Sequence, residues 1–286
     1  MTNIDQFESV FKSADKPRFQ LENSSLKSIF VITDLASEEA QAYHEHVGRF
    51  LETLARECDA TWRLITVDDY GDVAQLLQLV QNESPDLICT YRNLHLAIPD
   101  FPHSLGVFVD VLTQVVAMPV LLLPSPRMLR DGRAKLNSPD VVMAVTDHLT
   151  GDDHLVSQAA FFANPAGRLF LTHVEDEATF KRYIETIGKI PEIDTDHARE
   201  AILEQLLKEP HDYIRSCREV LKEADPDLDI QELITAGHRL SDYKRLIDEH
   251  DVSLLVMNTK DDEQLAMHGV AYPLAVELRE IPLLLL

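Results

Sequence analysis

The amino-acid sequence contains one α/β pattern twice, and this repeat constrains the fold more than any other feature. In each copy a short apolar segment ends in Thr-Asp, at Ile29–Asp34 and at Val142–Asp147. Each copy then closes with a proline and an apolar run, at Met118–Leu123 and at Ile281–Leu286. Such a repeat predicts two copies of one structural unit. A chain of 286 residues is long enough for two domains of this kind.

Composition and charge argue against several classes of protein. The formal net charge of -23 disfavours a nucleic-acid partner, because a polyanion would be repelled at long range. Cys58, Cys89 and Cys217 show no metal-ligand or redox spacing and fit packed thiols in a reducing cytosol. The start resembles no signal peptide, and no apolar run approaches the roughly 18 residues that a membrane-spanning helix needs. We therefore expect a cytoplasmic protein without a membrane partner.

Short apolar segments alternate with amphipathic ones along most of the chain. We expect four strands in the first copy, at residues 29–33, 62–67, 87–91 and 120–123. We expect five in the second, at 141–145, 168–174, 230–235, 253–257 and 283–286. Helices are expected at about 37–57, 72–82, 107–117, 155–163, 195–224, 241–250 and 271–279. This alternation is typical of a parallel sheet with helices on both faces.

The repeat and the local composition give the expected boundaries. Residues 1–25 form an N-terminal extension with a short docked helix, 26–124 the first domain, 125–140 a linker, and 141–286 the second, complete domain. The linker carries four basic residues in an otherwise acidic chain. It is either a solvated connector that neutralises acidic neighbours or a docking patch for an acidic partner. The basic residues are Arg127, Arg130, Arg133 and Lys135.

The spacing of landmarks differs between the copies. When Thr33 is aligned with Thr146, Leu64 falls opposite Leu233 only if a stretch of the second copy is skipped. The first copy then lacks one strand-helix unit, equivalent to Arg168–Asp229. On this alignment the expected strand at 62–67 corresponds to the one at 230–235, and not to the one at 168–174.

With this repeat, the chain resembles a tandem universal stress protein from residue 26 onward. Three features carry the resemblance: the strands that end at Asp34 and Asp147, the sequence Leu171-Thr172-His173-Val174-Glu175, and the glycines thirteen residues before Pro119 and Pro282. The resemblance implies two open parallel-sheet domains of the adenine nucleotide alpha hydrolase-like, Rossmann type. It also implies that their last strands, Val120–Leu123 and Leu283–Leu286, pair antiparallel and form a pseudo-dimer.

ATP-binding members of that family carry a loop of the form Gly-x-x-Gly, nine residues, Gly-Ser/Thr. Glycines let backbone N–H groups approach phosphate oxygens, and the hydroxyl adds a donor at a helix start. Here each copy keeps only the last glycine, Gly106 or Gly269. The other positions hold Asn93, Leu96 and Val107 in the first copy and Val256, Thr259 and Val270 in the second. Acidic residues 261–263 would also repel a triphosphate, so ATP is not expected to bind in the usual way.

The resemblance leaves a set of residual nucleotide-pocket positions. Asp34 and Asp147 would contact the nucleoside in a binding member, whereas the structural alternative for both is a cap at a helix start. His268 would lie at the pocket mouth or would be an ordinary loop residue. The full set is Asp34, Gly106, Asp147, Val174, His268 and Gly269.

Catalysis has little support in the sequence. There is no Gly-x-Ser-x-Gly elbow, Walker loop or Gly-x-Gly-x-x-Gly motif. His44 and His46 have the best metal-like spacing, but residues two apart point to different sides of a helix, so no metal is expected. The leading hypothesis is a non-enzymatic stress-response protein that binds a partner or a small ligand. The alternatives are an ATP or AMP sensor or weak ATPase that uses the second domain, and a lipid or metabolite cleft between the domains.

Overall fold

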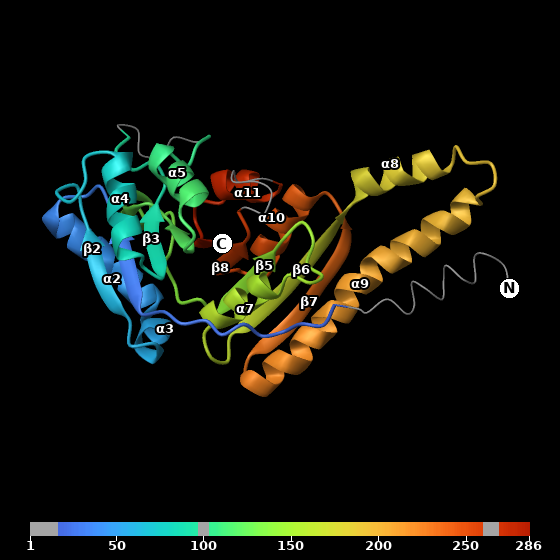
Figure 1. Ribbon diagram of the computed structural model, residues 1–286, viewed down its shortest axis with the longest axis horizontal. Helices are drawn as coiled ribbons and strands as arrows, with labels where there is room; N and C mark the ends of the chain where they lie inside the picture. The colour runs from blue at the N-terminus through green and yellow to red at the C-terminus, as the bar shows by residue number, and fades with distance from the viewer. Residues whose placement is uncertain (1–16, 97–102, 260–268) are drawn as a thin grey trace.

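The computed structural model describes residues 17–96, 103–259 and 269–286, and its strands form one nine-stranded sheet (Figure 1). The order across the sheet is β2-β1-β3-β4-β9-β8-β5-β6-β7, and every neighbouring pair is parallel except β4 with β9. The α/β class and all nine expected strands are therefore confirmed. The strands are β1 (Ser28–Ile32), β2 (Thr61–Ile65), β3 (Leu87–Tyr91), β4 (Val120–Leu123), β5 (Val141–Val145), β6 (Arg168–Asp176), β7 (Asp229–Gly237), β8 (Leu254–Met257) and β9 (Leu283–Leu285).

Helices lie in all seven regions that the sequence predicts after residue 25, and the described residues contain two further helices that were not predicted. The first predicted helix is divided into α2 and α3, because the backbone leaves helical geometry at Leu51. The two missed helices are α6 and α8. The helices are α2 (Ser37–Phe50), α3 (Glu52–Glu57), α4 (Val73–Glu83), α5 (Val107–Val115), α6 (Pro126–Arg130), α7 (Asp153–Phe162), α8 (Glu177–Ile187), α9 (Thr195–Ala224), α10 (Arg239–Glu249) and α11 (Ala271–Glu277).

Within the described ranges, no helix is long and apolar enough to cross a membrane.

Helices cover both faces of the sheet in its second half, residues 141–286. Glu232 of β7 accepts a hydrogen bond from His211 of α9 at 2.6 Å, so α9 covers the face to which Glu232 points. α7 shares that face, because the Tyr213 hydroxyl of α9 donates to Asp153 of α7 at 2.6 Å. On the other face, the ring of Phe170 in β6 lies 4.5 Å from that of His250 at the end of α10. Helices therefore lie on both faces of the sheet in this half, as is usual for parallel sheets.

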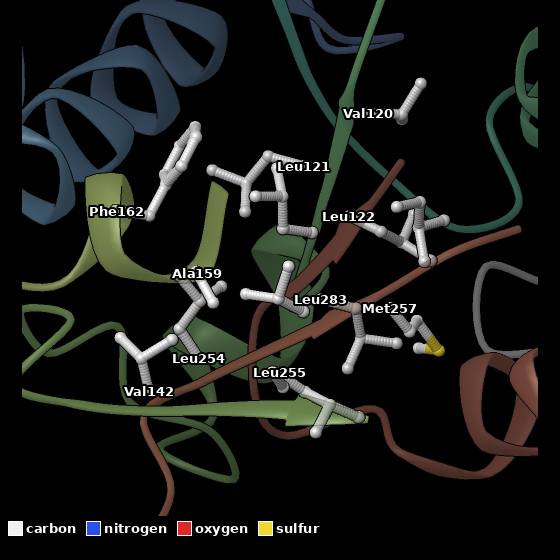
Figure 2. Close-up of a cluster of buried hydrophobic side chains, with 14 of the residues drawn as sticks. Val120, Leu121, Leu122, Val142, Ala159, Phe162, Leu254, Leu255, Met257 and Leu283 are labelled. Carbon is white, nitrogen blue, oxygen red and sulfur yellow. The ribbon is translucent and has the colours of Figure 1, made fainter. Parts of the chain in front are cut away.

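The two halves of the sheet are joined by the predicted antiparallel pair of closing strands. β4 and β9 pair with Leu121 opposite Leu284 and Leu122 opposite Leu283. The side chains of both strands are buried, and Figure 2 shows Leu121 and Leu122 in one apolar cluster with Leu283 and neighbours from β8. Pairing these strands with each other leaves neither as a bare apolar edge. The antiparallel junction that the sequence predicts within one chain is confirmed.

The position of β2 corrects the alignment of the two halves. In the second half β6 lies beside β5, and β7 lies beyond it at the outer end of the sheet. In the first half, residues 26–124, β2 pairs directly with β1, with Ser28 opposite Thr61. β2 therefore occupies the position of β6, and the expectation that it matches 230–235 is wrong. The unit without a counterpart in the first half is α8, α9 and the outer strand β7.

The N-terminal extension crosses the second half before it enters the first. The expected helix at 1–25 falls partly outside the described residues, and residues 17–25 contain no helix. Phe19 is 3% exposed, with its N–H donating to Ser216 Oγ at 3.0 Å and its ring 6.4 Å from that of Tyr213. The N–H of Glu22 donates to Ser157 Oγ of α7 at 3.0 Å. This segment is a second link between the halves, in addition to the β4–β9 pair.

The linker contains the short helix α6, which begins with a Ser125 cap and Pro126 at its first turn. Two of its basic side chains neutralise acidic neighbours. Arg130 forms an ion pair with Glu39 of α2 at 2.6 Å, and Arg127 lies 3.6 Å from Asp131. These contacts agree with the connector interpretation of the linker.

Candidate functional site

In open parallel sheets, ligands bind beyond the carboxyl ends of the strands where the order of connection reverses. In the second half this point lies between β5 and β8, and the predicted residues Asp147 and Gly269 meet there. A Cβ on Gly269 would overlap with Asp147 Oδ2. Gly269 also has φ +59°, a left-handed conformation that glycine adopts without strain. We call the group Asp147, Val174, Arg239, Thr259 and Gly269 the second-half site.

Arg239, at the start of α10, was not predicted and organises this site. Its Nη1 donates to Asp147 Oδ1 at 2.9 Å, its Nη2 to the Asp147 carbonyl at 3.0 Å, and its Nε to the Val174 carbonyl at 3.1 Å. All three guanidinium nitrogens thus have acceptors within the chain. The Arg239 side chain is 28% exposed and that of Asp147 38%, so the pair lies at the rim and not in the core. The only sequence signal was an arginine four residues after the predicted strand at 230–235 in an acidic chain.

Thr259 stands where a phosphate-binding loop has its second glycine, and its donors are already used. Both its N–H, at 2.9 Å, and its hydroxyl, at 2.6 Å, donate to the carbonyl of Leu286. The side chain is 2% exposed. This position therefore offers no donor to a phosphate oxygen. His268 and the acidic residues 261–263 lie outside the described residues.

Beside the second-half site, His173 is buried on β6. Its Nε2 lies 3.3 Å from Glu175 Oε2, and its ring centre lies 6.5 Å from that of His148. Burial lowers the pKa of His173, an effect that Glu175 opposes. The ring is thus held neutral near neutral pH. In the part of the chain that the structure describes, no three His, Cys, Asp or Glu side chains gather closely enough to hold a metal ion.

Neither Asp34 nor Asp147 caps a helix, so that interpretation of the two residues is wrong. Helix α2 begins after Ala36, with no side-chain cap. Helix α7 is capped by Asp152, whose Oδ1 accepts from the Leu155 N–H at 3.1 Å. The other Asp152 oxygen accepts from Asn258 Nδ2 at 2.7 Å, which ties the segment after β8 to α7. Asp152, which caps α7, therefore lies five residues after Asp147, which follows β5.

In the first half, the carboxylate of Asp34 is enclosed by donors of the chain itself. The Tyr91 hydroxyl donates to Oδ1, and the His95 N–H donates to Oδ2 at 2.7 Å. The Thr33 hydroxyl lies 2.8 Å from the same tyrosine oxygen. Burial, followed by the bond to Asp34, raises the pKa of Tyr91, so this hydroxyl stays protonated as a donor. Both Asp34 oxygens are thereby occupied.

Aromatic rings pack beside Asp34. Tyr70, His95 and Phe108 form a mutual cluster with ring centres 4.8 to 5.8 Å apart. Tyr70 is 2% exposed, and its hydroxyl donates to the Thr33 carbonyl at 3.3 Å. We call Asp34, Tyr70, Tyr91, His95 and Phe108 the first-half site.

The predicted residue Gly106 serves a close approach of two chain segments. It has φ +88°, and a Cβ there would lie 2.8 Å from Asn93 Cα. Asn93 takes the first glycine position and keeps the left-handed conformation that glycine would have, with φ +64°. Its N–H donates to the Leu105 carbonyl at 2.8 Å, and the Leu96 N–H donates to the Asn93 carbonyl at 3.1 Å. The N–H groups of Asn93 and Leu96 are thus both used within the chain.

Arg92, also missed from the sequence, reaches from this loop into the other half. Its guanidinium is buried and donates to the carbonyls of Ala275, at 2.9 and 2.7 Å, and Leu278, at 2.5 Å. These carbonyls end α11, where a cation is favoured by the helix dipole. Burial lowers the pKa of Arg92 to about 9. The end of β3 is therefore used as a contact between the halves.

A cavity of about 470 Å³ lies where the linker meets the second half. Its lining combines apolar side chains with charges of both signs, including Arg133, Asp248 and Glu280. A second cavity of about 420 Å³ shares these three residues. A mixed-charge lining differs from the apolar lining that an acyl chain would need.

No family model matches this sequence, and no curated protein matches it. Several solved structures are similar. One is a functionally unknown protein from Pseudomonas aeruginosa PAO1, with 15% identity, TM-score 0.49, and 91% of this chain and 92% of that chain covered. Another is a candidate universal stress protein from Pseudomonas aeruginosa UCBPP-PA14, with 15% identity, TM-score 0.49, and 91% and 93% covered. A third is a universal stress protein from Archaeoglobus fulgidus DSM 4304, with 11% identity, TM-score 0.48, and 91% and 85% covered.

Proposed function

We propose that this chain is a non-enzymatic protein of the universal stress protein type that binds a partner protein or a small ligand other than ATP. In this proposal its two halves act as a pseudo-dimer held by β4 and β9, and its role is in a stress response. The proposal rests on the chemistry of the two sites and on the sequence resemblance that led to them.

The closure of the first-half site is the observation that carries the proposal. Both oxygens of Asp34 accept hydrogen bonds from Tyr91 and His95, and aromatic rings pack beside them. A nucleoside that used this carboxylate would have to break the two hydrogen bonds that it accepts within the chain. Each bond to a charged group contributes roughly 1.5–3 kcal/mol. A site built in this way stabilises the fold and does not bind a nucleotide.

The second-half site supports the proposal through its donors. A triphosphate needs several converging N–H groups or cations. Here the Arg239 guanidinium is held by Asp147 and Val174, and the Thr259 donors by Leu286. The net charge of -23 adds long-range repulsion. We therefore propose that any ligand of this site in the cell carries no polyphosphate group.

A nucleotide sensor or weak ATPase that uses the second half is the alternative. The exposure of the Asp147 side chain, 38%, favours it over a nucleotide site in the first half. The complete set of strands in the second half is a further argument for this location.

Isothermal titration calorimetry of the full chain with ATP and with AMP tests the proposal. We expect no binding heat at micromolar nucleotide. A micromolar dissociation constant for ATP would falsify the assignment, and loss of that binding in Asp147→Asn would move the function to the alternative. Mass spectrometry of the supernatant from heat-denatured protein is a separate test, because a nucleotide retained through purification would also favour the alternative.

A further inference from the structure

β7 is an open strand at one end of the sheet. It has nine residues and pairs with β6 alone among the described strands. The Asp229 N–H donates toward β6, to the Gly167 carbonyl at 2.9 Å. Since backbone groups alternate between the two sides of a strand, the N–H and C=O groups of every second residue point away from β6. These outward residues are Ile230, Glu232, Ile234 and Ala236.

The other end of the sheet is less suited to strand addition. β2 has five residues, and its Thr61 N–H donates toward β1, to the Lys27 carbonyl at 2.8 Å. Only Trp62 and Leu64 then point outward within the strand. Arg63, in the middle of β2, forms an ion pair with Glu83. A short edge that carries charge is a common defence against pairing, whereas β7 is long and holds Leu233 and Ile234 at its centre.

We propose that β7 is a self-association surface on which a second copy of this chain pairs antiparallel, about a two-fold axis through Leu233. In this register Ile230 lies opposite Ala236 of the second copy, and Glu232 lies opposite Ile234. All four outward residues then face outward residues, which allows about eight backbone hydrogen bonds. This inference concerns a surface away from both sites and does not rest on the proposed function.

The sequence of β7 selects this register. If the second copy's strand is shifted by one residue, the outward N–H and C=O groups of one strand lie opposite residues whose backbone groups point the other way. The hydrogen bonds of the ladder then cannot form. A shift that moves the axis to Glu232 places two carboxylates directly opposite each other, which is unfavourable. A shift of the axis to Ile234 leaves Ile230 without a partner inside the strand. Only the register through Leu233 uses all nine residues and opposes no like charges.

A second copy is the occupant because the strand is complementary to itself under a two-fold axis. Such an isologous interface closes after two chains, whereas parallel addition would leave a new open edge each time. Two chains of net charge -23 repel each other at long range. We therefore expect the dimer to become more stable as salt screens this repulsion.

Light scattering coupled to size exclusion, over a concentration series at two salt concentrations, tests the proposal. We expect the wild-type chain to reach twice its mass of 32.4 kDa at high concentration and high salt. Ile234→Glu places carboxylates opposite Glu232 of the second copy and should weaken dimerisation at least tenfold. Ile234→Lys is the matched control, since it brings a similar loss of apolar contact but places an ammonium group opposite the same glutamate. This variant should dimerise at least tenfold more strongly than Ile234→Glu.

A crosslink fixes the register independently. In a Cys58→Ser background, Leu233→Cys places two thiols across the axis within reach of a disulfide, whereas Gln231→Cys places them several residues apart. We expect covalent dimers for Leu233→Cys only. Far-ultraviolet circular dichroism checks that each variant folds. A monomeric wild-type chain at all concentrations would overturn the proposal, as would a dimer that responds equally to both substitutions at Ile234.

Discussion

The two candidate sites carry equivalent aspartates at the ends of equivalent strands, in different surroundings. Asp34 is enclosed by Tyr91 and His95, and both its oxygens are bonded inside the chain. Asp147 forms an ion pair with Arg239 at the rim, and its side chain remains 38% exposed. Both aspartates are partly buried, but the carboxylate of Asp34 is bonded to a tyrosine hydroxyl and a backbone amide, whereas that of Asp147 is bonded to a charged side chain. The aspartate is kept in both halves for structural reasons that differ.

The comparison also explains why each half keeps one glycine of the former loop. Gly106 allows two backbone segments to approach each other, whereas Gly269 makes room for the Asp147 side chain. A backbone neighbour cannot move without disturbing the fold, but a rim side chain can rotate. A retained glycine is therefore no evidence of phosphate binding in either half.

The largest expected effect concerns the junction that makes the two sites parts of one molecule. Leu122→Lys places an ammonium group opposite Leu283 in a strand pair that is fully buried. An uncompensated buried charge costs about 3–5 kcal/mol, and adding Val120→Lys should extend the loss to the whole chain. Chemical denaturation should show one transition at much lower urea. Val115→Lys, at a side chain that is 50% exposed, is the control and should change stability by about 0.5 kcal/mol or less. Wild-type melting of the junction variants would contradict the role of this pair.

The two glycines offer a matched test of the difference between the sites. Gly106→Ala forces a Cβ against Asn93 backbone at 2.8 Å in a left-handed conformation, and should destabilise the chain by about 2–3 kcal/mol. Gly269→Ala has the same conformational penalty of about 1–2 kcal/mol, but the Asp147 carboxylate can turn away. Urea denaturation of both variants measures the difference. A larger loss of unfolding free energy for Gly269→Ala than for Gly106→Ala would contradict the view that the surroundings of Gly106 are the more rigid.

Loss of a hydrogen bond at Asp34 should lower the free energy of unfolding more than loss of the ion pair at Asp147. Tyr91→Phe removes a buried donor from Asp34 and should cost about 1–3 kcal/mol of unfolding free energy. Asp147→Asn removes the charge from a partly exposed ion pair with Arg239 and leaves the carbonyl partners of that arginine in place, so it should cost about 0.2–1 kcal/mol, less at high salt. Equal losses, or a salt-dependent loss for Tyr91→Phe, would show that the first-half site is not closed.

The sequence predicted the strands well because the periodicity of apolar residues reports burial directly. The β4–β9 junction was also predicted, through the resemblance to a tandem universal stress protein, and the pairing confirms it. The predicted position of β2 was wrong. The number of residues between matching sequence positions measures chain length, and it does not show which strand lies beside β1. Helix α8 was missed although Asp176 provides a cap, with its side chain accepting from the Thr179 N–H at 2.7 Å, and Phe180 and Ile184 provide an apolar face.

For the candidate sites, the sequence and the resemblance could identify which residues stand at the expected glycine positions, but not what those residues do. The contacts of Arg92 with Ala275 and of Arg239 with Asp147 join residues 183 and 92 positions apart. No local pattern encodes such distances along the chain. The cluster of Tyr70, His95 and Phe108 likewise forms only when three separate segments come together.

Native-state amide hydrogen exchange tests the contrast between the two sites most directly, because it requires no ligand. The His95 N–H donates to the Asp34 carboxylate at 2.7 Å, whereas the His148 N–H has a long contact of 3.4 Å with the Thr146 hydroxyl. A hydrogen bond to a charged group contributes about 1.5–3 kcal/mol, so we expect His95 to exchange at least about tenfold more slowly than His148 after correction for intrinsic rates. Equal exchange at the two amides would contradict the closed first-half site.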